Sequence, residues 1–252
     1  MLLLITDTSG KDGFVGLVRT GSGANPDRVE LVEEIALAGG TFSAQLVPQI
    51  SGLLEKHGFR KTDIGTFIVV SGPGSFTGLR VGLAAVKALA EILQKPIVPV
   101  SVLEVLAPFS LSIAASHDTP SVAMLRYAVA LDASRGEAFV GEYEVRSEAR
   151  RSPKAVGESL LSLDNLAALL ESGVLQWIST PDQTIFDALG KKVSESKKHS
   201  VRRNVRRPRS EEVGILGLQK LKAGETVSPE QLEANYLRRT DAEIFSKPTS
   251  HS

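Results

Sequence analysis

Short apolar runs separated by turn sequences predict three strands near the start of the chain. Residues 2–7, 14–20 and 28–36 are rich in aliphatic side chains and have the length of strands. The Asp-Gly dipeptide at 12–13 is typical of a tight hairpin between the first two runs. The third run alternates only in part with polar residues, so we expect it at the edge of a mixed sheet.

Two helices of different polarity are predicted after these strands. In the sequence, one precedes and the other follows a short buried strand predicted at 67–70. Apolar residues recur every three or four positions over 42–57, which is the pattern of an amphipathic helix. From 77 to 93 apolar residues surround the whole circumference of the second helix. Because such a helix is normally buried on every side, we expect one face on the sheet. Another face should meet the 42–57 helix, a partner chain, or both.

The second half of the chain repeats the order strand, aspartate, turn, strand. A strand at 127–131 ends at Asp132, as the first strand ends at Asp7, and a hairpin partner follows at 138–145. This similarity indicates a duplicated unit. Residues 110–121 and the tail from 245 are expected to be irregular. The remaining predicted elements are strands at 97–100 and 174–179, helices at 101–108, 163–171, 185–189 and 210–222, and an extended piece at 233–239.

The composition excludes several classes of function. With 42% hydrophobic and 23% charged residues the chain is typical of globular proteins, and its 29 basic and 29 acidic residues balance. The absence of cysteine excludes disulfides, thiolate metal sites and a cysteine nucleophile. The first residues lack the pattern of a signal peptide, and no run reaches the roughly 18 apolar residues of a membrane span. We therefore expect a cytoplasmic protein that does not contact membranes.

A glycine-rich loop, GPGSFTG at 72–78, joins the 67–70 strand to the second helix. Its spacing is neither that of a dinucleotide-binding fingerprint nor that of a P-loop. One interpretation is a tight turn that lets the helix pack close to the sheet. The other is a cradle in which backbone N–H groups and the hydroxyls of Ser75 and Thr77 face a phosphate or a partner's loop.

Candidate catalytic groups are few. Asp7 and Asp132 each allow two interpretations, a cation ligand near phosphates or the cap of a turn. The four histidines are not spaced as metal ligands, and no G-x-S-x-G turn marks a nucleophilic serine. Five arginines lie within the eight residues 202–209, where they either contact phosphates or form a solvated connector.

Four segments resemble one protein family. The strings SGPGSFTGLRVG at 71–82, DTSG at 7–10, ALDASRGEAFVGEY at 130–143 and ANYLRR at 234–239 are similar to TsaB (YeaZ) proteins. These bacterial proteins act in the synthesis of threonylcarbamoyladenosine on tRNA. The resemblance implies an α/β fold of the actin-like ATPase (ASKHA, ribonuclease-H-like) type, in which two lobes have mixed sheets flanked by helices.

The resemblance also implies a division of the chain. The first lobe covers residues 1–103, the second and smaller lobe covers 104–209, and a C-terminal extension covers 224–252. Helix 210–223 is expected to pack back on the first lobe.

By the same resemblance, the chain is a non-catalytic partner subunit of the complex that modifies the adenosine next to the anticodon. Its partners are the paralogue TsaD, which transfers the threonylcarbamoyl group, the ATPase TsaE, and tRNA through the complex; alone, the chain is expected to form a homodimer. We expect no cofactor of its own, with ATP or ADP only in the assembled complex. Phe42 stands where the family leads one to expect a histidine, so no metal role is transferred.

The alternative is a stand-alone nucleotide hydrolase, or a glycoprotease-like hydrolase of the same superfamily. Three sets of candidate residues follow from the loop, the two helices and the arginines. The nucleotide or partner loop comprises Asp7, Thr8, Gly72, Gly74, Ser75, Thr77, Gly78 and Arg80. The partner interface comprises Phe42, Gln45, Leu46, Gln49, Leu53, Leu79, Leu83, Val86 and Ala90, and the tRNA contacts are Arg202, Arg203, Arg206 and Arg207.

Overall fold

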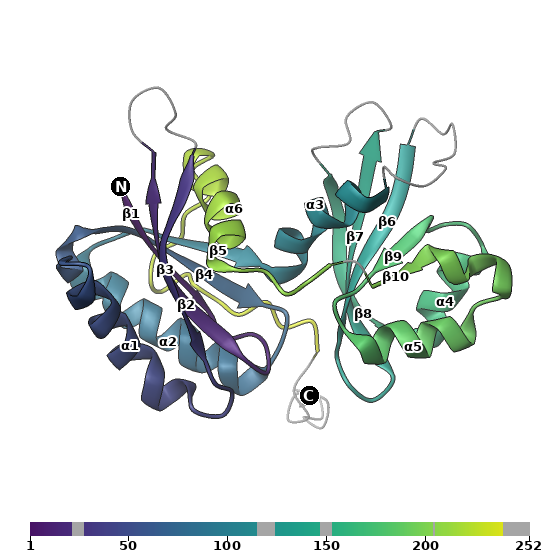
Figure 1. Cartoon of the computed structure of the whole chain (residues 1–252), viewed down its shortest axis with the longest axis horizontal. Helices are drawn as coiled ribbons and strands as arrows, with labels where there is room; N and C mark the ends of the chain where they lie inside the picture. The colour runs from purple at the N-terminus through teal and green to yellow at the C-terminus, as the bar shows by residue number, and fades with distance from the viewer. Residues whose placement is uncertain (22–27, 115–123, 147–152, 204, 239–252) are drawn as a thin grey trace, which may run out of the picture.

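The computed structural model describes residues 1–21, 28–114, 124–146, 153–203 and 205–238. They form two lobes, each built on a five-stranded mixed sheet (Figure 1). The first lobe contains β1 (Leu2–Asp7), β2 (Gly13–Thr20), β3 (Val29–Leu37), α1 (Phe42–Lys56), β4 (Ile64–Gly72), α2 (Phe76–Leu93) and β5 (Ile97–Ser101). After α3 (Val102–Ala114), the second contains β6 (Met124–Asp132), β7 (Glu137–Arg146), β8 (Lys154–Ser162), α4 (Leu163–Glu171), β9 (Trp177–Ser179), α5 (Gln183–Lys192) and β10 (Val201–Arg202).

The two sheets have the same topology, which confirms the predicted duplication. The first has the order β3-β2-β1-β4-β5, and the second, read from its β8 edge, has the order β8-β7-β6-β9-β10. In each sheet the first three strands form antiparallel hairpins, the fourth pairs in parallel with the strand that opens the lobe, and the fifth pairs in parallel with the fourth. The predicted edge position of the 28–36 strand is also confirmed.

Alternation along β1 separates the two faces of the first sheet. Leu2 and Leu4 point into a core that they share with α1 and α2, whereas Leu3 and Ile5 point to the opposite face. Helix α2 packs on β4 and on α1. Helix α1, which corresponds to the predicted 42–57 helix, is therefore one of the neighbours expected for the apolar surface of α2. Within the chain, α1 and α2 form one outer layer (Figure 1).

Helix α6 (Ser210–Lys222) covers the opposite face of the first sheet, although it follows the second lobe in sequence. Ser210, its first residue, donates from its backbone N and its Oγ to Glu34 Oε2 on β3, at 2.6 and 2.7 Å. Helix α6 and α3 both contribute to a core that continues into the inner face of the second sheet. Helices α4 and α5 pack on the outer face of that sheet.

Three elements differ from the sequence prediction. Helix α3 extends to Ala114, so the irregular segment predicted from 110 is wrong over 110–114, and 115–121 lie outside the described residues. Strands β8 and β10 were not predicted. All nine residues of β8 are half-exposed or exposed, and its sequence lacks the apolar pattern of a buried strand. Its pairing with β7 identifies it as a strand.

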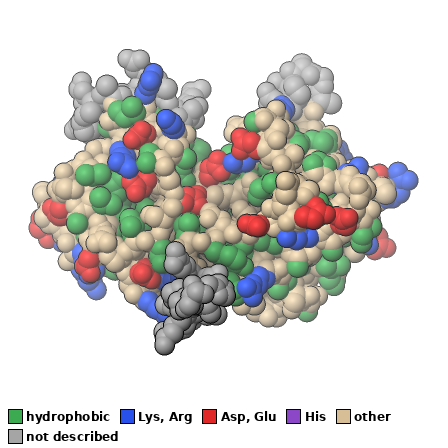
Figure 2. Space-filling model, turned by 180° about the vertical axis from the view of Figure 1, so that it is seen from behind, with side chains coloured by type: hydrophobic (Ala, Val, Ile, Leu, Met, Phe, Trp, Pro, Cys, Tyr) green, Lys and Arg blue, Asp and Glu red, His purple; other side chains and the backbone are tan. Residues whose placement is uncertain are grey.

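The predicted lobe boundaries stay a prediction, and the tail from 245 lies outside the described residues. Among the helices that the structure describes, none has the length and apolar character needed to cross a bilayer. In the space-filling view from behind, a notch separates the two lobes at one end (Figure 2).

The close approach of α6 to the first sheet gives a stability prediction. A Cβ at Gly217 would lie 2.6 Å from Ile68 Cγ2 and 2.8 Å from Cγ1, in a fully buried core. We expect Gly217→Ala to lower the free energy of unfolding by about 1–3 kcal/mol, as overpacking does. The measurement is chemical denaturation.

Gly190→Ala is the matched control, because Gly190 also lies in a helix and a Cβ there meets nothing within 4 Å. This variant should be neutral, or stabilised by up to about 1 kcal/mol through its helix propensity. Equal stability of the two variants would contradict the close packing of α6.

Candidate functional site

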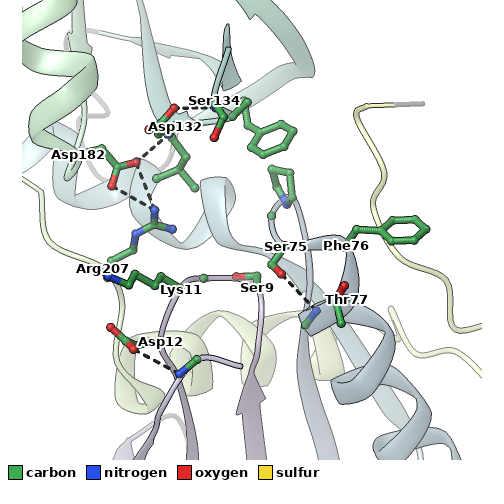
Figure 3. Close-up of a pocket in the computed structure, with 18 of the residues that line it drawn as sticks. Ser9, Lys11, Asp12, Ser75, Phe76, Thr77, Asp132, Ser134, Asp182 and Arg207 are labelled. Atoms are coloured by element: carbon green, nitrogen blue, oxygen red, sulfur yellow. Dashed lines mark hydrogen bonds and ion pairs between the residues drawn. The ribbon is translucent and has the colours of Figure 1, made fainter. Parts of the chain in front are cut away.

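A cleft of about 1560 Å³ lies between the lobes and exceeds the roughly 300–1,000 Å³ of ordinary small-molecule pockets (Figure 3). The first lobe contributes the β1–β2 turn and the glycine loop, and the second lobe contributes the β6–β7 turn and the start of α5. Residues 38–40 before α1 and 42–43 at its start, Arg203, Arg207 and the chain segment 235–238 also line the cleft.

Asp7 lies beneath the β1–β2 turn and does not line the cleft. Its Oδ1 accepts hydrogen bonds from the Ser9 backbone N at 2.8 Å and from Ser9 Oγ at 2.7 Å. Burial raises the pKa of the Asp7 carboxyl above its ordinary value, and the two Ser9 hydrogen bonds act in the opposite direction. These contacts favour the turn-cap interpretation of Asp7 over the cation-ligand interpretation.

Asp132 forms the equivalent turn in the second lobe, but there it is exposed and lines the cleft. Its Oδ1 accepts from the Ser134 backbone N at 2.7 Å, and its Oδ2 accepts from Thr184 Oγ1 at 3.1 Å. The backbone N of Asp132 donates to Asp182 Oδ2 at 2.8 Å. The carboxylate of Asp132 is therefore held by the β6–β7 turn and α5, as Figure 3 shows in part.

Asp182 is a cleft residue that the sequence did not single out. Besides the Asp132 backbone, it binds the guanidinium of Arg207 at 3.1 and 3.2 Å. The only local signal was an aspartate immediately before a short helix, where it is indistinguishable from an ordinary N-cap. Its side chain makes no cap hydrogen bond, because it is turned toward the cleft contacts.

The glycine loop packs on the β1–β2 turn. The backbone N of Ser75 donates to Ser9 O at 2.7 Å, and Ser75 Oγ caps α2 by accepting from the Gly78 backbone N at 3.2 Å. A Cβ at Gly74 would collide with Ser9 O, and one at Gly78 would collide with Thr8 O. Two N–H groups of the loop are thus bound within the chain, and two of its glycines serve close packing, which favours the tight-turn interpretation over the phosphate cradle.

The predicted loop residues are only partly brought together. Gly74, Ser75, Thr77 and Gly78 line the cleft, whereas Asp7, Thr8 and Gly72 are buried and do not line it. Arg80 is exposed and does not line the cleft either; its Nε donates to Tyr236 Oη at 3.3 Å, and its guanidinium lies 3.7 Å from the centre of the Phe76 ring.

The predicted partner interface needs correction. Seven of its nine side chains are at most 6% exposed, because they form the core between the two helices and the first sheet: Phe42, Leu46, Leu53, Leu79, Leu83, Val86 and Ala90. In this structure they cannot contact a partner. Gln45 Oε1 accepts from the Ala38 backbone N at 3.2 Å, and Gln49 is half-buried. The apolar residues that α1 and α2 do expose include Val47 and Ile92, which are 46% and 77% exposed.

The arginine segment does not present one uniform cationic surface. Arg202 is half-buried, 5.0 Å from the centre of the Trp177 ring, while Arg206 pairs with Glu212 and Arg207 with Asp182. Of the four predicted tRNA contacts, Arg203 is exposed, lines the cleft and has no ion-pair partner among the described residues.

No group of three or more histidine, aspartate or glutamate side chains arranged to hold a metal ion occurs in the described part of the chain. His57 bonds to Glu33 Oε2 at 2.7 Å and, like His199, does not line the cleft. His117 and His251 lie outside the described residues.

Comparison with known proteins agrees on one family. Residues 36–245 match the family model described as TsaD, tRNA N6-adenosine threonylcarbamoyltransferase. The chain is 28% identical over 250 residues to the tRNA threonylcarbamoyladenosine biosynthesis protein TsaB of Bacillus subtilis, covering 96% of both chains. It is 28% identical over 207 residues to the Escherichia coli protein of that name, covering 79% of this chain and 81% of the other.

Among solved structures, YeaZ from Pseudomonas aeruginosa superimposes with a TM-score of 0.68 at 23% identity, covering 94% of this chain and 99% of that one. The similarity confirms the expected actin-like, ribonuclease-H-like fold with two lobes of mixed sheets flanked by helices.

The environment of Asp7 gives a prediction that separates a turn cap from a functional carboxylate. Both Ser9 hydrogen bonds go to Oδ1, so Asp7→Asn keeps an acceptor for each of them. Because burial penalises only the charged form, we expect Asp7→Asn to be at least as stable as the parent at pH 7, and Asp7→Ala to lose about 1–3 kcal/mol through the unpaired Ser9 groups.

The pH dependence of Asp7→Asn follows from the raised pKa. The folded pKa of Asp7 exceeds its ordinary value of 3.8, so lowering the pH through the folded pKa toward that value protonates the folded parent first. The parent should therefore regain stability relative to Asp7→Asn over this interval in urea denaturation. A marked loss of stability in Asp7→Asn at pH 7 would show that the negative charge itself is needed.

Proposed function

This chain belongs to the family described as TsaD, tRNA N6-adenosine threonylcarbamoyltransferase, and we propose that it acts in threonylcarbamoyladenosine biosynthesis as a non-catalytic partner subunit. The resemblance to TsaB (YeaZ) proteins is confirmed. Relatives named as TsaB align over most of both chains. In contrast, a relative named as the transferase, from Magnetococcus marinus, is covered over 47% of its own length. The relatives that align over most of both chains are thus the ones named as TsaB, which supports the TsaB-like role.

The observation that carries the proposed role is the exposed face of α1 and α2, called here the helical face. It presents small or apolar side chains to solvent, namely Ala44, Val47, Pro48, Ala84, Ala88 and Ile92. Small side chains let another helix approach closely, and an apolar face of this kind loses water on docking. The occupant that we propose is the paralogous TsaD-type subunit, or a second copy when the chain is alone.

The contacts of Ser75 and Asp7 weigh against the alternative of a stand-alone hydrolase or glycoprotease-like hydrolase. Ser75 Oγ is used as a helix cap, and the carboxylate of Asp7 is buried and bound to Ser9. A nucleophilic serine needs a base within hydrogen-bond reach. Neither described histidine, His57 or His199, lines the cleft.

The other assignments remain proposals. We propose that TsaE joins the assembly, that ATP or ADP enters only in the complex, and that the protein works in the cytoplasm. The tRNA contact is proposed for Arg203 first, because the guanidinium groups of Arg206 and Arg207 are already paired with carboxylates of the chain.

Reconstitution tests the proposed function. The purified chain alone should show negligible ATP hydrolysis and no threonylcarbamoyl transfer to tRNA. It should restore transfer when it is added to a TsaD-type protein and TsaE that are inactive without it. The measurement is incorporation of labelled threonine into tRNA, and robust turnover by the chain alone would refute the partner-subunit role.

Charge substitutions test the helical face. Val47→Glu and Ala88→Glu should weaken pairing with the TsaD-type subunit at least about tenfold, because a carboxylate would be buried in an apolar contact at a cost of about 1.4 kcal/mol or more. Titration calorimetry measures the dissociation constant. Val86, although it belongs to the predicted interface, is fully buried and is unsuitable for this test.

Matched controls lie on the second lobe. Val174→Glu replaces a valine of similar exposure, 41%, and Ala168→Glu replaces an exposed alanine of another helix, α4. Both should pair normally. If the two helical-face variants fold and pair as tightly as these controls, the docking surface lies elsewhere.

A further inference from the structure

The segment 225–238, called here the inter-lobe strap, is anchored on the first lobe. Val227 pairs with Ile97 at the β5 edge of the first sheet, its N lying 2.9 Å from Ile97 O. Leu232 is 1% exposed and belongs to the core between the sheet and its outer helices. The backbone N of Asn235 donates to Ser71 O at 2.8 Å, directly before the glycine loop.

The same strap then contacts the second lobe. Asn235 Nδ2 donates to Glu158 Oε2 on β8 at 2.6 Å, and Arg238 forms an ion pair with Glu137 at the start of β7. Arg238 also donates to Ser134 O in the β6–β7 turn at 3.5 Å. Figure 1 shows the strap in yellow, passing from the first lobe toward the second.

Glu158 joins three segments with one carboxylate. Besides Asn235, it accepts from Ser101 Oγ, at the point where β5 ends and the chain passes into the second lobe. Glu158 is half-buried, and burial raises the pKa of its carboxyl group, while the hydrogen bonds from Ser101 and Asn235 act in the opposite direction. Other ionisable groups close enough to influence it or to be influenced by it are Glu104 on α3, Lys220 on α6 and Tyr143 on β7.

These contacts lie where they would oppose a change in cleft width. Residues 235–238 line the cleft, and Arg238 binds Ser134 and Glu137 at the β6–β7 turn of the second lobe. Moving the lobes apart would break the Asn235–Glu158 and Arg238–Glu137 contacts, whereas the backbone bond of Asn235 to Ser71 lies within the first lobe. Both contacts involve a half-buried carboxylate, and Arg238 and Glu137 are each about one-third exposed.

We propose that the inter-lobe strap is a third connection between the lobes, in addition to the chain crossings at 101–102 and 205–209, and that it fixes the width of the cleft. The hydrogen bond between Asn235 and Glu158, together with the ion pair between Arg238 and Glu137, is called here the latch of the strap. Release of the Asn235 and Arg238 side chains lets the cleft widen while each lobe stays folded and the shared core is kept. This role is a property of the chain alone and does not depend on the proposed partner.

A distance measurement between spin labels tests the strap. The chain has no cysteine, so Glu91→Cys on α2 and Ala168→Cys on α4 place one label on the exposed surface of each lobe. Asn235→Ala combined with Arg238→Ala should move the distance distribution to longer values and broaden it about twofold or more. An unchanged distribution in this variant, with normal circular dichroism, would overturn the proposal.

The matched control combines Glu233→Ala, an exposed position on the same strap, with Arg146→Ala, an exposed position at the far end of β7. It removes one acid and one base elsewhere and should keep the distance distribution of the parent. A control that opens as widely as the Asn235 and Arg238 variant would also overturn the latch, because the specific contacts would not matter.

An isosteric variant covers the case in which the double alanine variant does not fold. Asn235→Asp places a second carboxylate against Glu158 without a change of volume. Repulsion between the two carboxylates should open the lobes at pH 8, with the parent measured at the same pH. A parent-like distribution for Asn235→Asp at pH 8 would refute the latch.

Discussion

The structure depends on one shared core between the two sheets. Helix α6 leaves the second lobe and returns to the inner face of the first sheet, where it packs beside α3. Gly214 and Gly217 make this return close, because any Cβ there would meet Ile5 or Ile68. Since the apolar side chains of both sheets are removed from water by the same two helices, the lobes cannot separate fully without exposing that core.

The cleft lies outside this core, at the carboxyl-terminal ends of β1 and β6, where the β1–β2 turn and the related β6–β7 turn both line it. Both turns are closed by an aspartate that accepts from the residue two positions later, Asp7 from Ser9 and Asp132 from Ser134. Their environments differ, because the glycine loop packs on the first turn and buries Asp7, while the second turn is open to the cleft. Duplication of the fold therefore did not duplicate the chemistry of the site.

The apolar residues of α2 are divided between the core of the first lobe and the exposed helical face. Leu79, Leu83 and Val86 of α2 are buried, whereas its exposed residues include Ala84, Ala88 and Ile92. An apolar circumference by itself did not reveal which residues faced inward, so the predicted interface named core residues such as Leu79 and Val86. Because these residues are buried, the proposed docking surface consists of exposed residues such as Val47, Ala88 and Ile92.

The sequence by itself determined the order of most strands and helices, the duplication and the family, because local periodicity, turn residues and contiguous motifs are sufficient to identify them. It did not reveal β8, whose half-exposed residues have no apolar pattern, or the cleft role of Asp182, which looks like any residue before a helix. Only the tertiary structure decided which side chains of α2 are buried and where the strap lies. Asn235 is placed by Ser71 and Glu158, and partners so distant in sequence are brought together only when both lobes are folded.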